Sequence, residues 1–226
     1  MNTINKDKQL ILSVTREQLF GCFLQYNFNG FIREELFSSQ MQKIDYYAND
    51  LQKLFSERGP LEIDSTRKQI IPYVVIGSKK NETFLSYIRP GKGNEERLHD
   101  KGSIGFGGHI EPDDAGNVVN IFDVIIECAK REVKEELSLW AGDMKFTTLG
   151  YINDDSNPVG QVHFGVVLYL DVSDVPTEDV IKMLNSNSEV DRLNFRTISD
   201  LQSMSEYYET WSQYVLNALP YIDFTK

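Results

Sequence analysis

The sequence has 226 residues, of which 41% are hydrophobic and 25% are charged, and its formal net charge is −11. This composition is typical of a globular protein, and a chain of this length buries enough apolar surface to fold without disulfide bonds. The negative charge argues against a large nucleic-acid surface, because the phosphate backbone requires a basic footprint.

The first 65 residues predict a mainly helical extension. A short strand pattern covers residues 9–14, and apolar side chains recur at helical spacing over residues 16–58, with a break at residues 27–30. Gly59 and Pro60 are expected to end this helical region. We therefore predict an N-terminal extension over residues 1–65, which can act as a partner-binding module, and a separate domain over residues 66–226.

The rest of the chain alternates between strand and helix patterns. Strands are predicted at residues 70–76, 83–88, 146–152, 162–172 and 194–197, a turn at 77–81, and helices at 120–140 and 199–218. Ser199 is the predicted N-cap of the last helix. This order of elements predicts a mixed α/β domain.

An acidic cluster lies on the helix predicted at residues 120–140. Glu132, Glu135 and Glu136 stand at positions i, i+3 and i+4, so they share one side of the helix beside its apolar stripe. Three crowded carboxylates repel one another unless a cation binds among them, and hard oxygen ligands suit Mg²⁺ or Mn²⁺. Arg131 lies one turn before Glu135 and can hold its carboxylate. From the helix alone, a solvated charged face is the alternative.

A glycine-rich segment, Gly105-Phe106-Gly107-Gly108-His109-Ile110-Glu111, precedes this helix. Glycine allows the backbone to approach a phosphate or a metal ion closely. The alternative is a tight turn or bulge between strands.

Taken together, these residues resemble the Nudix box, whose pattern is Gly, five residues, Glu, seven residues, then Arg-Glu-hydrophobic-X-Glu-Glu-X-Gly-hydrophobic. The matching residues are Arg131, Glu132, Val133, Glu135, Glu136 and Leu139. Asp123 stands where the family has Glu, and Ser138 stands where it has Gly. Fourteen residues instead of five separate Gly108 from Asp123, and we interpret residues 112–119 as a loop insertion.

A wider stretch, roughly residues 66–216, is similar to a bacterial group of MutT-like predicted phosphoesterases in the Nudix hydrolase superfamily. The runs that carry this resemblance are residues 68–73, 103–110 and 152–160. The resemblance implies a Nudix-like α/β/α sandwich with a mixed β-sheet. It also implies a hydrolase, dependent on Mg²⁺ or Mn²⁺, that cleaves a diphosphate linkage in a nucleoside diphosphate derivative or a similar small molecule.

The same resemblance assigns roles within the box. Glu132, Glu135 and Glu136 would be metal ligands, the backbone carbonyl of Gly107 an additional ligand, and Arg131 the residue that orients Glu135. One of the box glutamates, with Glu135 as the candidate, can take a proton from the attacking water. The alternative function is a non-catalytic Nudix-fold module that binds nucleotides or regulates a partner, although all three glutamates are present.

Candidate substrate-binding residues lie in and after the loop that precedes the glycine-rich segment. Arg89, Lys92 and Arg97 can grip phosphate oxygens, with Gly108 close to the substrate. Because acidic residues interleave with these cations, a solvated loop is the alternative. His163 is expected to be a packed or hydrogen-bonded histidine, with a catalytic role as the alternative. Asp154 and Asp155 are expected to be turn residues, and the alternative is that they face the site.

Two features of the sequence bear on location and partners. Cys22 and Cys128 are isolated cysteines, which favours a reducing, cytoplasmic compartment. No apolar run approaches 18 residues and the first eight residues are polar, so neither a membrane span nor a signal peptide is predicted. The expected partner is a small diphosphate or nucleotide-derived substrate, and a homodimer is a further candidate.

Overall fold

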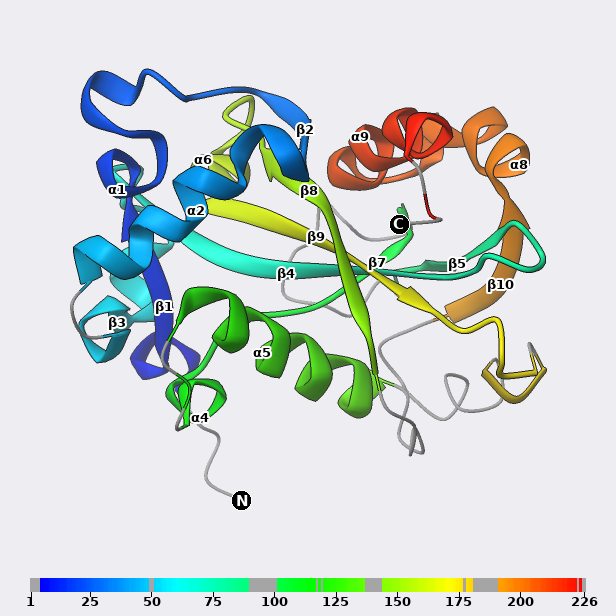
Figure 1. The fold of residues 1–226 in the computed structure, drawn as a ribbon, viewed down its shortest axis with the longest axis horizontal. Helices are drawn as coiled ribbons and strands as arrows, with labels where there is room; N and C mark the ends of the chain where they lie inside the picture. Colours follow the sequence, from blue (N-terminus) through cyan, green and yellow to red (C-terminus); the bar gives the residue numbers. More distant parts are fainter. Residues whose placement is uncertain are drawn as a thin grey trace. The chain divides into compact units, whose positions relative to one another are not determined.

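The computed structural model describes residues 5–48, 51–89, 101–116, 118, 120–136, 144–176, 178–180, 191–222 and 224, without the side chains of residues 46–48, 136 and 191. Figure 1 shows the helices and strands along the chain. The chain divides into two compact units. Unit 1 contains Met1–Pro72, Gly107–Ala129 and Gly150–Val167, and unit 2 contains Tyr73–Phe106, Lys130–Leu149 and Leu168–Lys226. In the part of the chain that is described, no helix has the length and apolar character needed to cross a membrane.

The N-terminal region contains both helices and strands. Its elements are η1 (Lys6–Lys8), β1 (Leu10–Thr15), α1 (Arg16–Phe20), η2 (Cys22–Leu24), β2 (Gly30–Arg33), α2 (Glu34–Ala48), η3 (Leu51–Leu54), β3 (Phe55–Glu57) and α3 (Arg58–Leu61). The strand predicted at residues 9–14 is confirmed, whereas β2 and β3 were not predicted. Gly59 and Pro60 lie inside α3 and do not end the helical region. A proline is tolerated there because the first turn of a helix leaves its N–H groups without helical partners.

Strand pairing connects the N-terminal strands to distant parts of unit 1. β1 pairs with β3 on one side and with the start of β4 (Arg67–Ser78) on the other, where Ser13 faces Gln69. β2 pairs with the end of β8 (Phe146–Asn153), in register from Gly30 with Asn153. Residues 1–72 therefore share a compact unit with residues 107–129 and 150–167. The predicted boundary between an extension and a domain at residue 65 stays a prediction.

An aromatic cluster forms part of the core of unit 1. Its members are Phe20, Phe28, Phe37, Tyr151 and Phe164, and their ring centroids lie 5.3–6.2 Å apart in mostly edge-to-face or tilted pairs. Such pairs contribute beyond the apolar area that they bury. The cluster joins the N-terminal helices to β8 and β9 (His163–Asp171).

The remaining elements largely follow the predicted order. They are β4, β5 (Thr83–Ile88), β6 (Gly102–Ser103), β7 (Gly105–Phe106), α4 (Pro112–Ala115), α5 (Ile121–Glu136), β8, α6 (Pro158–Val162), β9 and β10 (Asp191–Thr197). The five strands predicted in this region are confirmed, β5 with its predicted ends and the other four with shifted ends. Because β4 continues to Ser78, the turn occupies residues 79–82. Residues 137–140 of the predicted helix lie outside the described residues.

Sheet order can be given for each unit. In unit 1 the strands lie in the order β4-β9-β8-β2, and in unit 2 they lie in the order β10-β5-β4, with β6 on β5 and β7 on β4. The division between the units passes through β4, α5, β8 and β9, which contribute residues to both. Residues 112–119, which we interpreted as a loop insertion, contain α4. This helix begins with a reciprocal capping box between Glu111 and Asp114.

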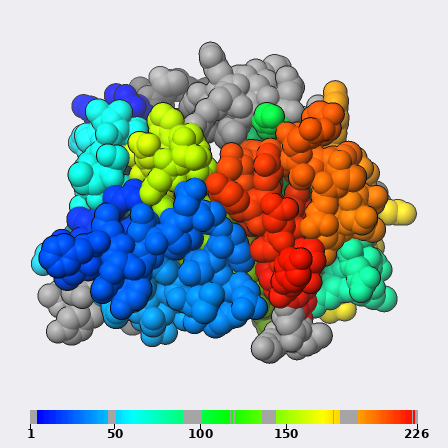
Figure 2. Space-filling view, turned by 90° about the horizontal axis from the view of Figure 1, so that it is seen from above, coloured from blue at the N-terminus to red at the C-terminus, as the bar shows by residue number. Residues whose placement is uncertain are grey.

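The C-terminal region differs from its prediction. In place of one helix over residues 199–218, the structure has α8 (Ile198–Ser203), η5 (Ser205–Tyr207) and α9 (Thr210–Ala218), followed by η6 (Leu219–Tyr221). Thr197, and not Ser199, caps α8 by accepting from the backbone N–H of Asp200, and Glu209 caps α9. The two helices lie side by side, in orange and red (Figure 2).

Candidate functional site

The last two turns of α5 bring together the described members of the predicted acidic cluster. Nη1 of Arg131 lies 2.6 Å from Oε1 of Glu132 and 3.5 Å from Oε2 of Glu135. The side chain of Glu132 is 15% exposed and that of Glu135 is 61% exposed. Arg131 therefore contacts two carboxylates, and its shorter contact is with the neighbouring Glu132. Glu136 is the last described residue of α5, and its side chain lies outside the described residues.

The chemistry of this cluster fits a hard divalent cation. Glu132 and Glu135 offer carboxylate oxygens on one face of the helix, which are the donors that Mg²⁺ and Mn²⁺ prefer. Arg131 lowers the repulsion between the two carboxylates and restricts their orientation. The residues present can therefore hold such an ion.

Gly107 and Gly108 follow β7 and precede α4. Gly107 has a φ angle of 155°, a conformation that residues with a side chain rarely adopt, so a glycine is required at this point of the chain. The backbone conformation is compatible with the predicted use of the Gly107 carbonyl as a ligand, which stays a prediction.

The structure describes one of the three predicted cationic substrate-binding residues. Arg89 is half-buried, with its guanidinium carbon 5.8 Å from the centroid of the Tyr87 ring, and its backbone N–H donates to the carbonyl of Lys101. Lys92 and Arg97 lie outside the described residues. A phosphate-binding role for this loop therefore stays a prediction.

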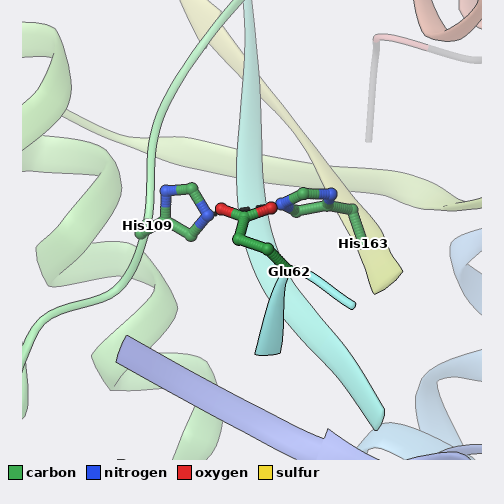
Figure 3. A group of neighbouring side chains, drawn as sticks. All are labelled: Glu62, His109 and His163. Carbon is green, nitrogen blue, oxygen red and sulfur yellow. Dashed lines mark hydrogen bonds between the residues drawn. The ribbon is translucent and has the colours of Figure 1, made fainter. Parts of the chain in front are cut away.

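A second group of potential ligands, Glu62, His109 and His163, lies in unit 1 (Figure 3). Glu62 follows α3, His109 lies in the segment after β7, and His163 is the first residue of β9. One ligand atom from each residue lies within 4.8 Å of the others. Nε2 of His109 is 2.7 Å from Oε1 of Gln69 and 3.3 Å from Nε2 of His163. In Figure 3 the Glu62 carboxylate and the two imidazole rings point toward one another.

The environment of His109 favours its neutral form. Burial lowers the pKa of His109 to about 2, and the positive charge of Arg58 and the nearby His163 act in the same direction. His163 is buried, and its Nδ1 lies 2.8 Å from the Val159 carbonyl. Sequence reasoning anticipated a packed or hydrogen-bonded His163. It did not find the cluster, because the three residues are far apart in the chain and share no motif.

A buried ion-pair network also escaped the sequence analysis. Nζ of Lys68 is fully buried and contacts Oδ1 of Asp155 at 2.8 Å and the carbonyl oxygen of Gly160 at 2.6 Å, while Arg16 pairs with the same carboxylate. Burial lowers the pKa of Lys68 to about 8. Asp154 accepts a hydrogen bond from the backbone N–H of Ser156, as expected for a turn residue. Asp155 instead pairs with Arg16 and Lys68, so it joins its own loop to two other segments of unit 1. The only sequence signal was a lysine within a β-rich run.

No protein-family model matches the sequence. The chain is similar to protein YmaB of Bacillus subtilis (strain 168), with 38% identity over 165 residues that cover 72% of this chain and 76% of YmaB. Among solved structures it is similar to Tm1382, which is provisionally named a Nudix hydrolase, with a TM-score of 0.64 and 24% identity over 93% of this chain and 98% of Tm1382.

Proposed function

The chain belongs to the same family as protein YmaB and has the Nudix fold of Tm1382, and from its acidic helix we propose that it hydrolyses a diphosphate linkage in a small molecule. The Nudix-like α/β fold predicted from the sequence is thereby confirmed. The observation that carries the activity is the contact of Arg131 with both Glu132 and Glu135 near the end of α5. A nucleoside diphosphate derivative is the proposed substrate class.

We assign the predicted roles to these residues. Glu132, Glu135 and Glu136 hold Mg²⁺ or Mn²⁺, with the carbonyl of Gly107 as an additional ligand. When bound, such an ion neutralises charge on the diphosphate and lowers the pKa of a coordinated water. Arg131 positions the carboxylates, and its contact with Glu132 is the shorter of the two.

Proton transfer and substrate binding are assigned to Glu135 and to four further residues. Glu135 is the most exposed described member of the cluster, which supports it as the acceptor of the proton from the attacking water. Arg89, Lys92, Arg97 and the backbone of Gly108 are proposed to contact phosphate oxygens. A cytoplasmic location and a homodimer stay predictions.

The test begins with a screen of nucleoside diphosphate conjugates, dinucleoside polyphosphates and nucleoside triphosphates, with and without Mg²⁺, with products identified by mass. On a substrate found in this way, Glu132→Gln, Glu135→Gln and Glu136→Gln should each lower turnover by on the order of 10²-fold or more, because charge that develops in the transition state is no longer neutralised. Glu206→Gln, which removes an exposed carboxylate from η5, is the matched control and should leave turnover unchanged.

A binding or regulatory module without hydrolysis is the second candidate function. It predicts that the three glutamine variants keep their fold and bind nucleotides as the unmodified protein does, with no turnover in any of them. Metal-dependent product formation that all three substitutions reduce would exclude it. Unchanged turnover in folded variants would instead contradict the assignment of the acidic helix as the active site.

A further inference from the structure

The Glu62, His109 and His163 cluster is built from three separate elements of unit 1. Its ligand atoms converge from the end of α3, the segment after β7 and the first residue of β9, to within 4.8 Å of one another. Two imidazoles and one carboxylate form a ligand set that suits zinc and other divalent transition metals, in contrast to the all-oxygen set of the acidic helix.

The distance between the two histidines matches the spacing of metal ligands. The Nε2 atoms of His109 and His163 lie 3.3 Å apart. Two nitrogen ligands of a tetrahedral zinc ion, each about 2.0–2.1 Å from the metal, are separated by about 3.3–3.4 Å. An ion could therefore be shared by the two rings with little movement of either side chain.

Surrounding groups orient the ligands. Nδ1 of His163 donates to the Val159 carbonyl at 2.8 Å, which leaves the lone pair of Nε2 directed into the cluster. Nε of Arg58 donates to Oε1 of Glu62 at 2.7 Å and holds that carboxylate. A carbonyl behind the histidine and a cation behind the carboxylate are typical outer contacts of a metal site.

Gln69 adds a second, independent observation. Its side chain is 1% exposed, its Oε1 lies 2.7 Å from Nε2 of His109, and its buried Nε2 has no hydrogen-bond partner. Buried amide groups normally satisfy their hydrogen-bonding capacity, and exceptions need an explanation. Oε1 of Gln69 and Nε2 of His163 are both acceptors, and both face Nε2 of His109. A metal cation bound at this point could accept lone pairs from several of these atoms at once.

We propose that Glu62, His109 and His163 bind one zinc-type divalent ion, with Gln69 beside it. This site goes beyond the proposed hydrolase activity and does not depend on it, since it uses other residues and another class of ion. Three protein ligands leave a coordination position for water or for a ligand oxygen.

The experiment is a Zn²⁺ titration of the chelator-treated full chain by isothermal calorimetry, in excess Mg²⁺ that occupies the acidic helix, together with the visible absorption spectrum after Co²⁺ is added under the same conditions. We expect one Zn²⁺ per chain and a Co²⁺ spectrum typical of a low-coordinate nitrogen and oxygen site. Glu62→Gln, His109→Gln and His163→Gln should each weaken Zn²⁺ binding by more than about tenfold. Because Glu62 is part-exposed, its variant should fold even if a histidine variant does not.

Three control variants separate this site from the rest of the chain. His99→Gln changes the third histidine of the sequence, Glu57→Gln removes an exposed carboxylate near α3, and Glu132→Gln alters the acidic helix. All three should bind Zn²⁺ as the unmodified chain does. The proposal is overturned if the unmodified chain binds no Zn²⁺, if a folded Glu62→Gln variant binds it equally well, or if Glu132→Gln alone abolishes binding. Loss of Zn²⁺ binding together with retained hydrolysis would leave the proposed function intact.

Discussion

At the scale of single residues, Lys68 shows how a charge is accommodated inside unit 1. Its ammonium is fully buried, and it donates to the carboxylate of Asp155 and to the carbonyl of Gly160. A buried ion loses much of its hydration, so each partner matters more than it would at the surface. Burial raises the pKa of Asp155, but the hydrogen bonds from Arg16 and Lys68 outweigh it and hold that pKa well below its usual range.

The first prediction removes one partner from this network. Asp155→Asn should lower the free energy of unfolding by about 2–3 kcal/mol, because Lys68 would keep a buried charge without its counter-ion. Urea unfolding at pH 7 measures the change. The double variant Lys68→Met/Asp155→Asn should recover part of the loss, since it removes the uncompensated charge as well. Equal stabilities of Asp155→Asn and the unmodified protein would show that this pair contributes nothing net.

The second prediction concerns the pH dependence of the same pair. The pKa of Asp155 is depressed in the folded state, so the folded protein binds fewer protons than the unfolded chain at acid pH. Its contribution is present above the unfolded value of 3.8 and is lost as the pH falls below it. The difference in stability between the unmodified protein and Asp155→Asn should therefore shrink as the pH falls below about 4. A difference that grows as the pH falls below about 4 would contradict the assigned direction.

At the scale of elements, the start of α9 depends on Glu209. Its carboxylate accepts from the backbone N–H groups of Trp211 and Ser212, at 2.8 and 2.9 Å, and from the hydroxyl of Tyr73 at 2.6 Å. All of these groups belong to unit 2. Burial, followed by the charge of Glu209, raises the pKa of Tyr73 well above its usual value, so its hydroxyl stays a donor. One carboxylate thus joins a helix end to β4.

The third prediction follows from these contacts. Glu209→Ala should lower the free energy of unfolding by about 2 kcal/mol, because it removes a helix cap and leaves the buried Tyr73 hydroxyl with one partner fewer. Thermal and urea unfolding measure the loss. Glu206→Ala, which removes an exposed carboxylate in η5 three residues earlier, is the control and should change stability by less than about 0.5 kcal/mol. Similar losses in both variants would point to general charge effects.

Elements with a strong local signal were predicted well from the sequence. β5 is bounded by turn residues and matches its predicted range, and the apolar stripe of α5 identified that helix. By contrast, β2 and β3 are short strands whose partners, Gly150–Asn153 and β1, are distant in the sequence, so no local pattern marks them. The break at η5 within the predicted C-terminal helix was missed, and Glu209 is not among the usual capping residues.

The candidate sites divide in the same way. Arg131, Glu132 and Glu135 could be found because their relation is local, within one helix, where sequence spacing determines position. Glu62, His109 and His163 come together only through the tertiary fold, as do Lys68 and Asp155. Isolated histidines, acidic residues and lysines form no motif with a fixed spacing. Because these residues are far apart in the sequence, their contacts could not be predicted from it.

At the scale of the whole molecule, the question is whether residues 66–226 can fold without the N-terminal region. Within unit 1, β1 pairs with β4, and the backbone N–H of Leu12 donates to the carbonyl of Ile110 at 2.9 Å. Phe20 and Phe37 pack on Phe164. Removing the first 65 residues would expose one edge of β4 and one side of the aromatic cluster. Exposed strand edges and apolar patches favour aggregation.

The fourth prediction is that a chain of residues 66–226 expressed alone will not show cooperative unfolding and will aggregate, whereas adding or co-expressing residues 1–65 will restore solubility. The physical reason is that the pairing of β1 with β4 and the contacts of Phe20 and Phe37 can form between two separate chains as they do within one. Solubility, thermal unfolding and size-exclusion chromatography of both preparations measure the outcome. As a graded control, Phe37→Ala in the full chain should destabilise it by about 3–5 kcal/mol without preventing folding at low temperature. A soluble, cooperatively unfolding chain of residues 66–226 would instead support an independent domain with a separable extension, as the sequence pattern alone predicts.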